Sequence, residues 1–162
     1  MNERQQIARA WEIADDVGIC MFTTHVNGRM RARPLKAYAS EDEGCFWFIT
    51  DDRGHKDDEI AAEPDVCLSF ADTGYNTYLS VTGRAEVLRD RAKLAELWDF
   101  DAQAWWPDGP DTPSVRLLRV VPESAEFWDT RGSSIVVAFR LAAARLRGTE
   151  PELDLSKKVQ MR

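Results

Sequence analysis

The amino-acid sequence predicts a mainly β protein in which about six short strands form a small antiparallel barrel, closed or split, with helices packed around it. The strand-like segments are mostly joined by tight turns, which favours an antiparallel barrel over a doubly wound parallel sheet. The chain has 162 residues, enough for one domain with its own core. Hydrophobic residues make up 44% and charged residues 30%, as in ordinary globular proteins.

An amphipathic helix is expected over residues 3–17. Ile7, Trp11 and Ala14 recur there at helical spacing, and Gly18 follows as a typical helix end. These side chains share one face, so the helix should lie on the core.

A β-hairpin is expected next. The segment "ICMFTTHV", residues 19–26, is rich in β-branched and aromatic residues, and Asn27 and Gly28 form the strongest short-range hairpin signal. The second strand of the hairpin runs over residues 29–39. Pro34 in its middle predicts an edge strand or a bulge, because proline cannot donate a hydrogen bond to a neighbouring strand.

A short, dense strand, "CFWFIT", is expected over residues 45–50, after the turn "EDEG". A short helix follows from His55 to Glu63, and Pro64 ends it. Five acids cluster around the start of this helix. Capping and dipole interactions explain them better than a metal site does: Asp51, Asp52, Asp57, Asp58 and Glu59.

Two further strands are expected over residues 66–72 and 77–88, joined by the turn "TGYN". The second of them alternates apolar and polar residues, as a half-buried strand does. Gly83 within it indicates a bulge or a close approach of another part of the backbone.

The last third of the chain gives mixed signals. Asp90 is a good N-cap for a helix over residues 91–100, which leads into the aromatic-rich connection "WWPDGPD". The other expectations are strands over 115–122 and 124–129, a helix from residue 133 or 134 to 148 in which "IVVAF" alone would equally suit a strand, and no clear structure over 149–162.

The composition excludes several classes of partner. A net charge of −7 argues against a nucleic-acid backbone, which is bound by a basic face. No apolar stretch approaches the roughly 20 residues of a membrane helix, and the charged start "MNERQQIARAW" is unlike a signal peptide, so the cytoplasm is the expected location. Three cysteines without metal-ligand spacing are expected to be buried thiols: Cys20, Cys45 and Cys67.

Three arginines in the second predicted strand suggest an anion site. Arg29, Arg31 and Arg33 occur at period two and therefore leave one face of the strand, where their charges repel one another unless an anion lies among them. If this strand pairs with "CFWFIT", its start lies beside "DDRGHK", which adds basic groups and a helix N-terminus suited to phosphate. The alternative is that the arginines only protect an edge strand and form solvated surface pairs.

Five segments in order resemble the general stress protein branch of the pyridoxamine 5'-phosphate oxidase-like flavoproteins. They are "GRMRARPL", "FWFITDDRGHKDDEIAAEPDVCLSFAD", "YLSVTGRAEVLRD", "LWDFDAQAWWPDGPD" and "VRLLRVVPESAEFWD", within residues 5 to 130. The resemblance implies a six-stranded antiparallel split β-barrel of the FMN-binding type, and a homodimer that binds FMN at the subunit interface. No nucleic-acid or membrane partner is expected, as the composition already indicates.

The resemblance also implies which residues contact FMN. The family's phosphate-binding Arg and Lys map onto Arg31 and Lys36, although the "RP" of the stress-protein branch falls on Arg33 and Pro34, and both registers stay open. The cofactor contacts implied in this strand are thus Arg31, Arg33, Pro34, Leu35 and Lys36.

Other implied contacts come from later segments. The aromatic-Thr end of the family's third strand falls on Ile49 and Thr50, and its Ser-Arg-Lys phosphate motif falls on Gly54, His55 and Lys56. A glutamine that contacts the flavin ring falls on Tyr78. Trp105 and Trp106 can close over a flat ring or serve as core or dimer-interface residues, and Trp106 is taken as a contact.

Two departures from the family pattern limit the implied activity. His55 replaces an arginine, so the local charge depends on a pKa near neutrality and FMN binding should be weaker and pH-dependent. The oxidase's Arg-x-His substrate motif is absent, because the chain has only His25 and His55. True pyridoxamine 5'-phosphate oxidase activity is therefore not expected.

The sequence thus leaves three functional hypotheses. The first is an FMN-dependent oxidoreductase in which the flavin carries the hydride or electron chemistry, with no catalytic side chain assigned. The second is a non-catalytic flavin-binding or sensing protein of the stress response. The third is a split-barrel dimer that binds another ligand.

Overall fold

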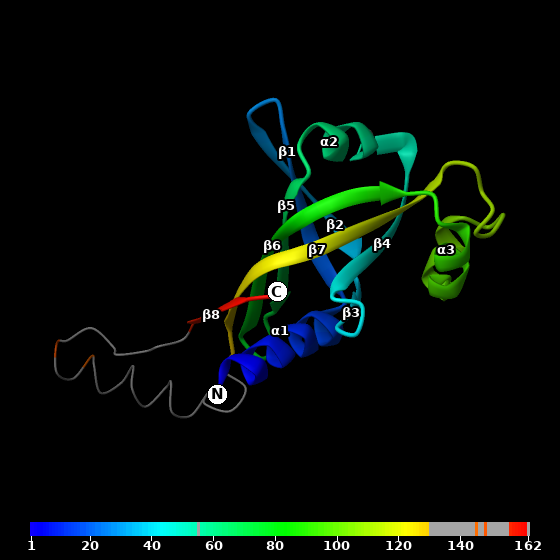
Figure 1. The fold of residues 1–162 in the computed structure, drawn as a ribbon. Helices are drawn as coiled ribbons and strands as arrows, with labels where there is room; N and C mark the ends of the chain where they lie inside the picture. Colours follow the sequence, from blue (N-terminus) through cyan, green and yellow to red (C-terminus); the bar gives the residue numbers. More distant parts are fainter. Residues whose placement is uncertain (55, 130–144, 146–147, 149–155, 162) are drawn as a thin grey trace.

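The computed structural model describes residues 1–54, 56–129, 145, 148 and 156–161. Its strands form one antiparallel sheet in the order β2-β1-β5-β6-β7-β4-β3, with β8 also paired to β7 (Figure 1). The strands are β1 (Ile19–Val26), β2 (Arg29–Lys36), β3 (Tyr38–Ser40), β4 (Cys45–Asp51), β5 (Asp65–Asp72), β6 (Thr77–Leu88), β7 (Val115–Trp128) and β8 (Ser156–Gln160). The helices are α1 (Glu3–Val17), the 3₁₀ turn η1 (Asp52–Gly54), α2 (Lys56–Ala62), α3 (Arg91–Leu97) and α4 (Phe100–Trp105).

The sheet is curled into a split barrel. Strands β2 and β3 lie at opposite ends of the strand order, yet Ala37 alone separates them in the chain. The sheet must therefore bend round until its two edges meet at this residue, whose N–H donates to the carbonyl of Gly18 at 2.8 Å. Within the described residues no strand pairing joins the two edges elsewhere. The predicted mainly β antiparallel barrel is confirmed.

Helix α1 packs against the barrel with its apolar side. Asn2 and Gln5 form a capping box at its start, and Gly18, at φ 72°, ends it. Trp11 is buried and stacks on Phe46 of β4 with ring centroids 4.5 Å apart. The helix spans the residues predicted from the 3.6-residue period.

Strand β4 is buried on both faces, which explains its dense apolar sequence. Phe46 and Phe48 point into the barrel, whereas Trp47 and Ile49 point the other way, under α3 and α4. The barrel core also contains large side chains of β1, β5, β6 and β7, including Phe22, Leu68, Phe70, Leu79, Leu118 and Phe127.

Several element boundaries differ from those predicted. The expected strand over residues 29–39 breaks at Ala37, where the chain crosses from one sheet edge to the other. The two strands expected near the end form the single strand β7, and residues 156–160, which gave no signal, form β8 against it. The described sheet thus has eight strands instead of six.

Of the two helices predicted in the last third of the chain, one is divided in the structure and the other lies mostly outside the described residues. The helix expected over residues 91–100 divides into α3 and α4, because Asp99 caps a new helix. The helix expected from residue 133 or 134 to 148 lies outside the described residues except for Arg145 and Gly148. No helix among the described residues is long and apolar enough to cross a membrane.

Gly83 has both features predicted for it. The register of β6 and β7 shifts between Thr82 and Gly83, and a Cβ atom on Gly83 would lie 2.4 Å from the carbonyl oxygen of Val121. The two strands can approach this closely only because position 83 has no side chain.

The cysteines differ from one another. Cys20 and Cys45 are buried, and burial raises the pKa of the two thiols to about 12 and about 11. Cys67 is only half-buried and lies 3.6 Å from the hydroxyl of Ser80. The prediction of three buried thiols is therefore wrong for Cys67.

Candidate functional site

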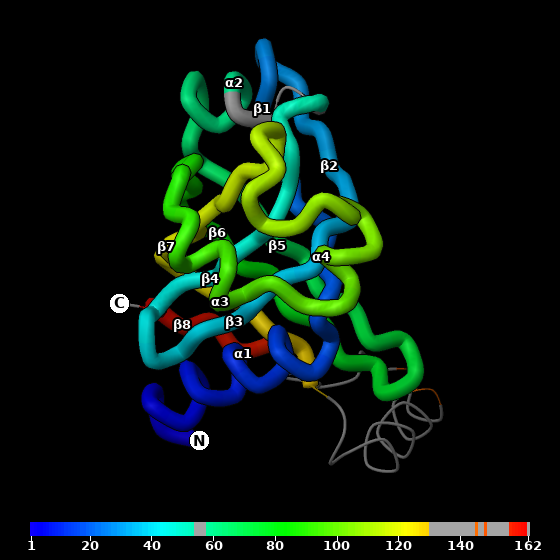
Figure 2. The backbone as a smooth tube through the Cα atoms, turned by 90° about the vertical axis from the view of Figure 1, so that its right-hand side faces the viewer, coloured from blue at the N-terminus to red at the C-terminus, as the bar shows by residue number. Residues whose placement is uncertain are grey.

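The two central arginines of β2 converge on one carboxylate. Arg33 donates from Nη2 to Oε2 of Glu59 at 2.7 Å and to Oγ1 of Thr24 at 2.9 Å. Arg31 donates from Nη1 to Oε1 of Glu59 at 3.2 Å, and Thr24 donates to Oε2 at 2.8 Å. Glu59 belongs to α2, which lies against the β1–β2 hairpin (Figures 1 and 2).

The cluster of Arg31, Arg33 and Glu59 has a net charge of +1, because one carboxylate neutralises only one of the two guanidinium groups. Glu59 is 8% exposed, and a buried carboxylate is stable only when it is paired. Burial lowers the pKa of Arg33, and the neighbouring Arg31 lowers it further, while Glu59 opposes both effects. Nη1 of Arg33 is buried and has no hydrogen-bond partner among the described residues.

The convergence was predicted, but its cause was not. The sequence predicted that the strand over residues 29–39 pairs with the strand over 45–50, which would bring its arginines beside the segment that follows. Within the described residues only the β3 part of that strand pairs with β4, and the arginines contact the following segment through Glu59 of α2 instead. Glu59 was interpreted as part of a capping cluster, and this interpretation is wrong. At the fourth position of α2, the helix turn directs it toward β1 and β2, which the sequence alone does not show.

Two predicted phosphate ligands lie next to this cluster in the chain. Lys56 is the first residue of α2, although its side chain is not among those described, and His55 lies outside the described residues. Thr50 is 3% exposed and shares a face of β4 with Phe48, toward the barrel interior. Helix α2 has only seven residues, so its dipole adds little positive charge here, and the described positive charge comes from Arg31 and Arg33.

Lys36 lies in a separate ion-pair cluster at the other end of β2. Its Nζ donates to Asp99 at 2.7 Å and to Asp101 at 2.6 Å, and the hydroxyl of Tyr38 donates to Asp99 at 2.9 Å. The hydrogen bonds to Asp101 and Asp99 raise the pKa of Lys36. Burial alone would raise the pKa of Asp99, but the hydrogen bond from Lys36 and those from Ala102 N–H and Tyr38 outweigh it and lower that pKa.

The two proposed registers of β2 therefore have different surroundings. Arg31 and Lys36 are five residues apart, about 16 Å along a strand, and leave opposite faces. Leu35 shares the face of the arginines and packs on the core, whereas Pro34 is exposed on the other face. An anion of phosphate size cannot contact both Arg31 and Lys36.

Ile49 and Trp106 share an apolar cluster under α3 and α4. Ile49 is 8% exposed, and Trp106 packs against the cluster with its ring centroid 6.1 Å from that of Trp98. Nε1 of Trp106 is buried without a hydrogen-bond partner in the described part of the chain. Trp105, in contrast, is 76% exposed. Of the two tryptophans, only Trp106 takes part in packing.

Tyr78 lies far from all of these groups. It pairs with Trp128 at one end of β7, whereas Thr50 pairs with Arg116 near the other end. Arg116 and Trp128 are twelve positions apart, which corresponds to about 40 Å of strand. One flavin therefore cannot contact both Tyr78 and Thr50 of the same chain.

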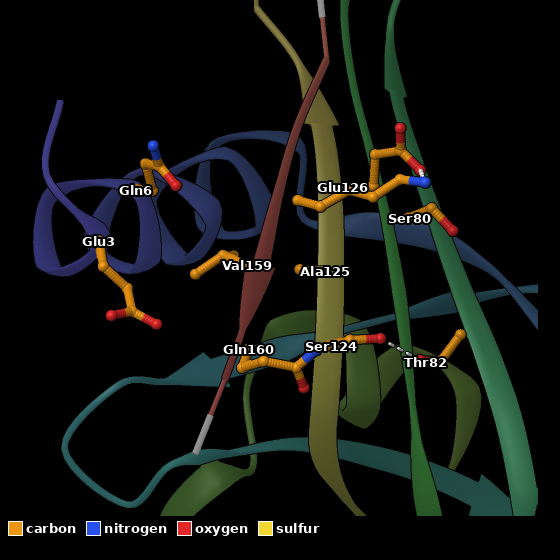
Figure 3. Close-up of a pocket in the computed structure, with 10 residues that line it drawn as sticks. Glu3, Gln6, Ser80, Thr82, Ser124, Ala125, Glu126, Val159 and Gln160 are labelled. Carbon is orange, nitrogen blue, oxygen red and sulfur yellow. Dashed lines mark hydrogen bonds and ion pairs between the residues drawn. The ribbon is translucent and has the colours of Figure 1, made fainter.

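A cavity of about 590 Å³ contains none of the predicted site residues (Figure 3). Glu3 and Gln6 of α1 lie on one side of it, and side chains of β6, β7 and β8 lie on the other. A hydroxyl pair, Thr82 and Ser124, is joined by a hydrogen bond of 2.7 Å at this cavity. Nothing in this lining indicates a particular ligand.

The chain is similar to a known protein family and to individual members of known sequence and structure. The family model described as "Pyridoxamine 5'-phosphate oxidase like" matches residues 5–152. Protein bli-3 of Neurospora crassa is 25% identical over 118 residues, which are 66% of this chain and 56% of that protein. The chain thus spans little more than half the length of this relative.

Two solved structures resemble the fold closely. A protein described as general stress protein 26 from Jannaschia sp. CCS1 is 28% identical, with a TM-score of 0.76, over 97% of this chain and 99% of its own. A general stress FMN/FAD binding protein from Xanthomonas citri is 22% identical, with a TM-score of 0.71, over 80% of this chain and 92% of its own. At that identity, the second likeness concerns the fold alone.

Proposed function

The chain belongs to the pyridoxamine 5'-phosphate oxidase-like family, and on this premise we propose that it is an FMN-binding flavoprotein that acts as an oxidoreductase. The observation that carries the proposal is the arginine pair on β2. It has an excess positive charge, and a buried N–H at Arg33 Nη1 finds no hydrogen-bond partner in the described part of the chain. A buried donor without a partner marks a place where a ligand or water is needed.

The residues of this cluster fit a phosphate group. Arg31 is 62% exposed at its side chain and has donors left over after its single bond to Glu59. An arginine fork suits phosphate oxygens, and Lys56 at the start of α2 would add a second kind of cation. We therefore assign the FMN phosphate to Arg31 and Arg33, and propose Lys56, His55 and Thr50 as further ligands.

The flavin ring would lie toward the other end of β2. Lys36, Ile49 and Trp106 are the proposed ring-side residues, and the unpartnered Nε1 of Trp106 is a donor available to a ligand. When bound, FMN would supply the hydride or electron transfer, as cofactors of this kind do. The chain's own residues bind and orient it and shield it from water.

We also propose that the protein is a homodimer with FMN at the subunit interface. The distance of about 40 Å of strand between Tyr78 and Thr50 supports this proposal. If both residues contact flavin, they must contact different flavins or belong to different subunits. The molecular mass in solution, measured by light scattering after gel filtration, should be twice the 18.4 kDa of the chain, and a monomer would refute this part.

The test of flavin binding is a titration of the purified protein with FMN, followed by flavin fluorescence. Quenching that saturates at one FMN per chain is expected, and absence of quenching would refute the proposal. Loss of the visible absorbance of the bound flavin on addition of NAD(P)H would support an oxidoreductase. A bound flavin that no nicotinamide reduces would favour the non-catalytic flavin-binding protein instead.

A further inference from the structure

Glu59 is an unusual residue for its position. It is the one acidic side chain in the described part of the protein that is buried. Two of its partners, Arg33 and Arg31, come from β2 and lie 26 and 28 residues from it in the sequence. Thr24, also buried, adds a third hydrogen bond. A carboxylate in this place has to be compensated, and the arginines compensate it.

The two arginines are held to different degrees. Arg33 is mostly buried, with a side chain 16% exposed, and its Nη2 donates twice, to Glu59 and to Thr24. Arg31 makes one longer bond of 3.2 Å and is 62% exposed. Arg33 is therefore fixed in the fold, whereas Arg31 can turn toward solvent or a ligand at little cost.

We propose that Glu59 is an internal counter-ion that occupies part of the anion site and so limits how tightly the arginine pair holds a phosphate group. Its carboxylate provides the negative charge that buried Arg33 requires when no ligand is present. A phosphate has to share Arg33 with Glu59 and recruit Arg31 away from it. The residue thus acts as an affinity-determining residue, and this inference rests on the proposed phosphate site.

Glu59→Gln tests the inference because it removes the charge and keeps the size of the side chain. In phosphate-free buffer the variant should melt at a lower temperature than the wild type, since Arg33 is then a buried cation without a counter-ion. Inorganic phosphate should take over that role. An anion at a hundred times its dissociation constant raises the melting temperature of a chain this size by roughly 5–10 °C, and the wild type should respond much less.

Flavin binding gives a second measurement that does not depend on stability. Riboflavin lacks the phosphate, so the ratio of FMN to riboflavin affinity reports the phosphate contacts alone. Glu59→Gln should increase this ratio about tenfold, and Arg31→Ala should decrease it about tenfold, in line with a charged hydrogen bond. Arg31→Ala leaves the Glu59–Arg33 pair intact and should fold normally, because Arg31 is exposed.

Two controls define the effect. Glu63→Gln makes the same chemical change four residues later, at a carboxylate that is 47% exposed and paired with His25, and should alter neither phosphate response nor ratio. The double variant Glu59→Gln, Arg33→Met removes both buried charges, so its melting temperature should not respond to phosphate.

Each outcome decides for or against the inference. An FMN to riboflavin ratio that stays the same or falls in Glu59→Gln overturns it, as does a melting temperature insensitive to phosphate. If Glu59→Gln does not fold in either buffer, an unchanged ratio in Arg31→Ala overturns it. A wild type that binds neither flavin refutes the proposed function instead, while the response to inorganic phosphate still tests Glu59.

Discussion

Gly83→Ala should destabilise the protein, because the added methyl group would collide with the backbone of β7. The new Cβ would lie 2.4 Å from the carbonyl oxygen of Val121 and 3.0 Å from Cα of Pro122. Both atoms belong to the backbone of a strand in the middle of the sheet, so neither can move aside as a flexible side chain would. Strands β6 and β7 must separate locally to admit the methyl group.

The expected loss is about 2 kcal/mol. Overpacking a close-packed region costs about 1–3 kcal/mol, and a rigid backbone neighbour puts this position in the upper half of that range. The reduced freedom of alanine in the unfolded chain offsets about 0.4–1 kcal/mol. For a chain of this size, a loss of 2 kcal/mol lowers the melting temperature by about 4–8 °C.

The assay is urea unfolding followed by tryptophan fluorescence, together with a thermal scan by circular dichroism. Gly74→Ala is the matched control, because a Cβ there meets only the side-chain oxygen of Asp72, at 3.3 Å. The control should change stability by less than about 0.5 kcal/mol. Equal stabilities of the two variants would show that the close approach at Gly83 is not what requires glycine.

Three further predictions concern the residues around the site. Trp106→Ala should cost about 2 kcal/mol because the ring is packed, whereas Trp105→Ala should stay within about 0.5 kcal/mol in the same urea assay; equal losses would contradict the assignment of Trp106 to the apolar cluster. Asp99 has a lowered pKa, so its pairing with Lys36 stabilises the fold above the ordinary carboxyl pKa of 3.8 and is lost as the pH falls below it. The stability advantage of wild type over Asp99→Asn, under about 1 kcal/mol at pH 7, should therefore shrink as the pH falls below about 4 and vanish once the pH is below the lowered pKa of Asp99. An advantage that does not shrink over this range would argue against the ion pair. A thiol reagent should modify Cys67 in the native protein before the two buried cysteines, as mass spectrometry can show, and equal rates would contradict the burial described above.

Local chemistry explains the parts of the fold that could be predicted from the sequence. The 3.6-residue period of α1, the Asn27–Gly28 turn and the bulge at Gly83 each depend on neighbouring residues or on a property of glycine itself. The boundaries that were predicted wrongly depend on the whole sheet. The break at Ala37 exists because the chain changes sheet edge there, and β8 becomes a strand because β7 offers it a partner.

The candidate site could likewise be predicted from the sequence only in part. The alternation of Arg31 and Arg33 in the sequence already indicated an anion between them, since like charges on one strand face repel one another. The tertiary structure determined that one such anion is Glu59, that Arg33 is buried against it, and that Lys36 is paired with Asp99 and Asp101 instead. A strand pattern tells which side chains share a face, whereas the partner of a charge depends on long-range packing, which brings α2 and α4 onto β2.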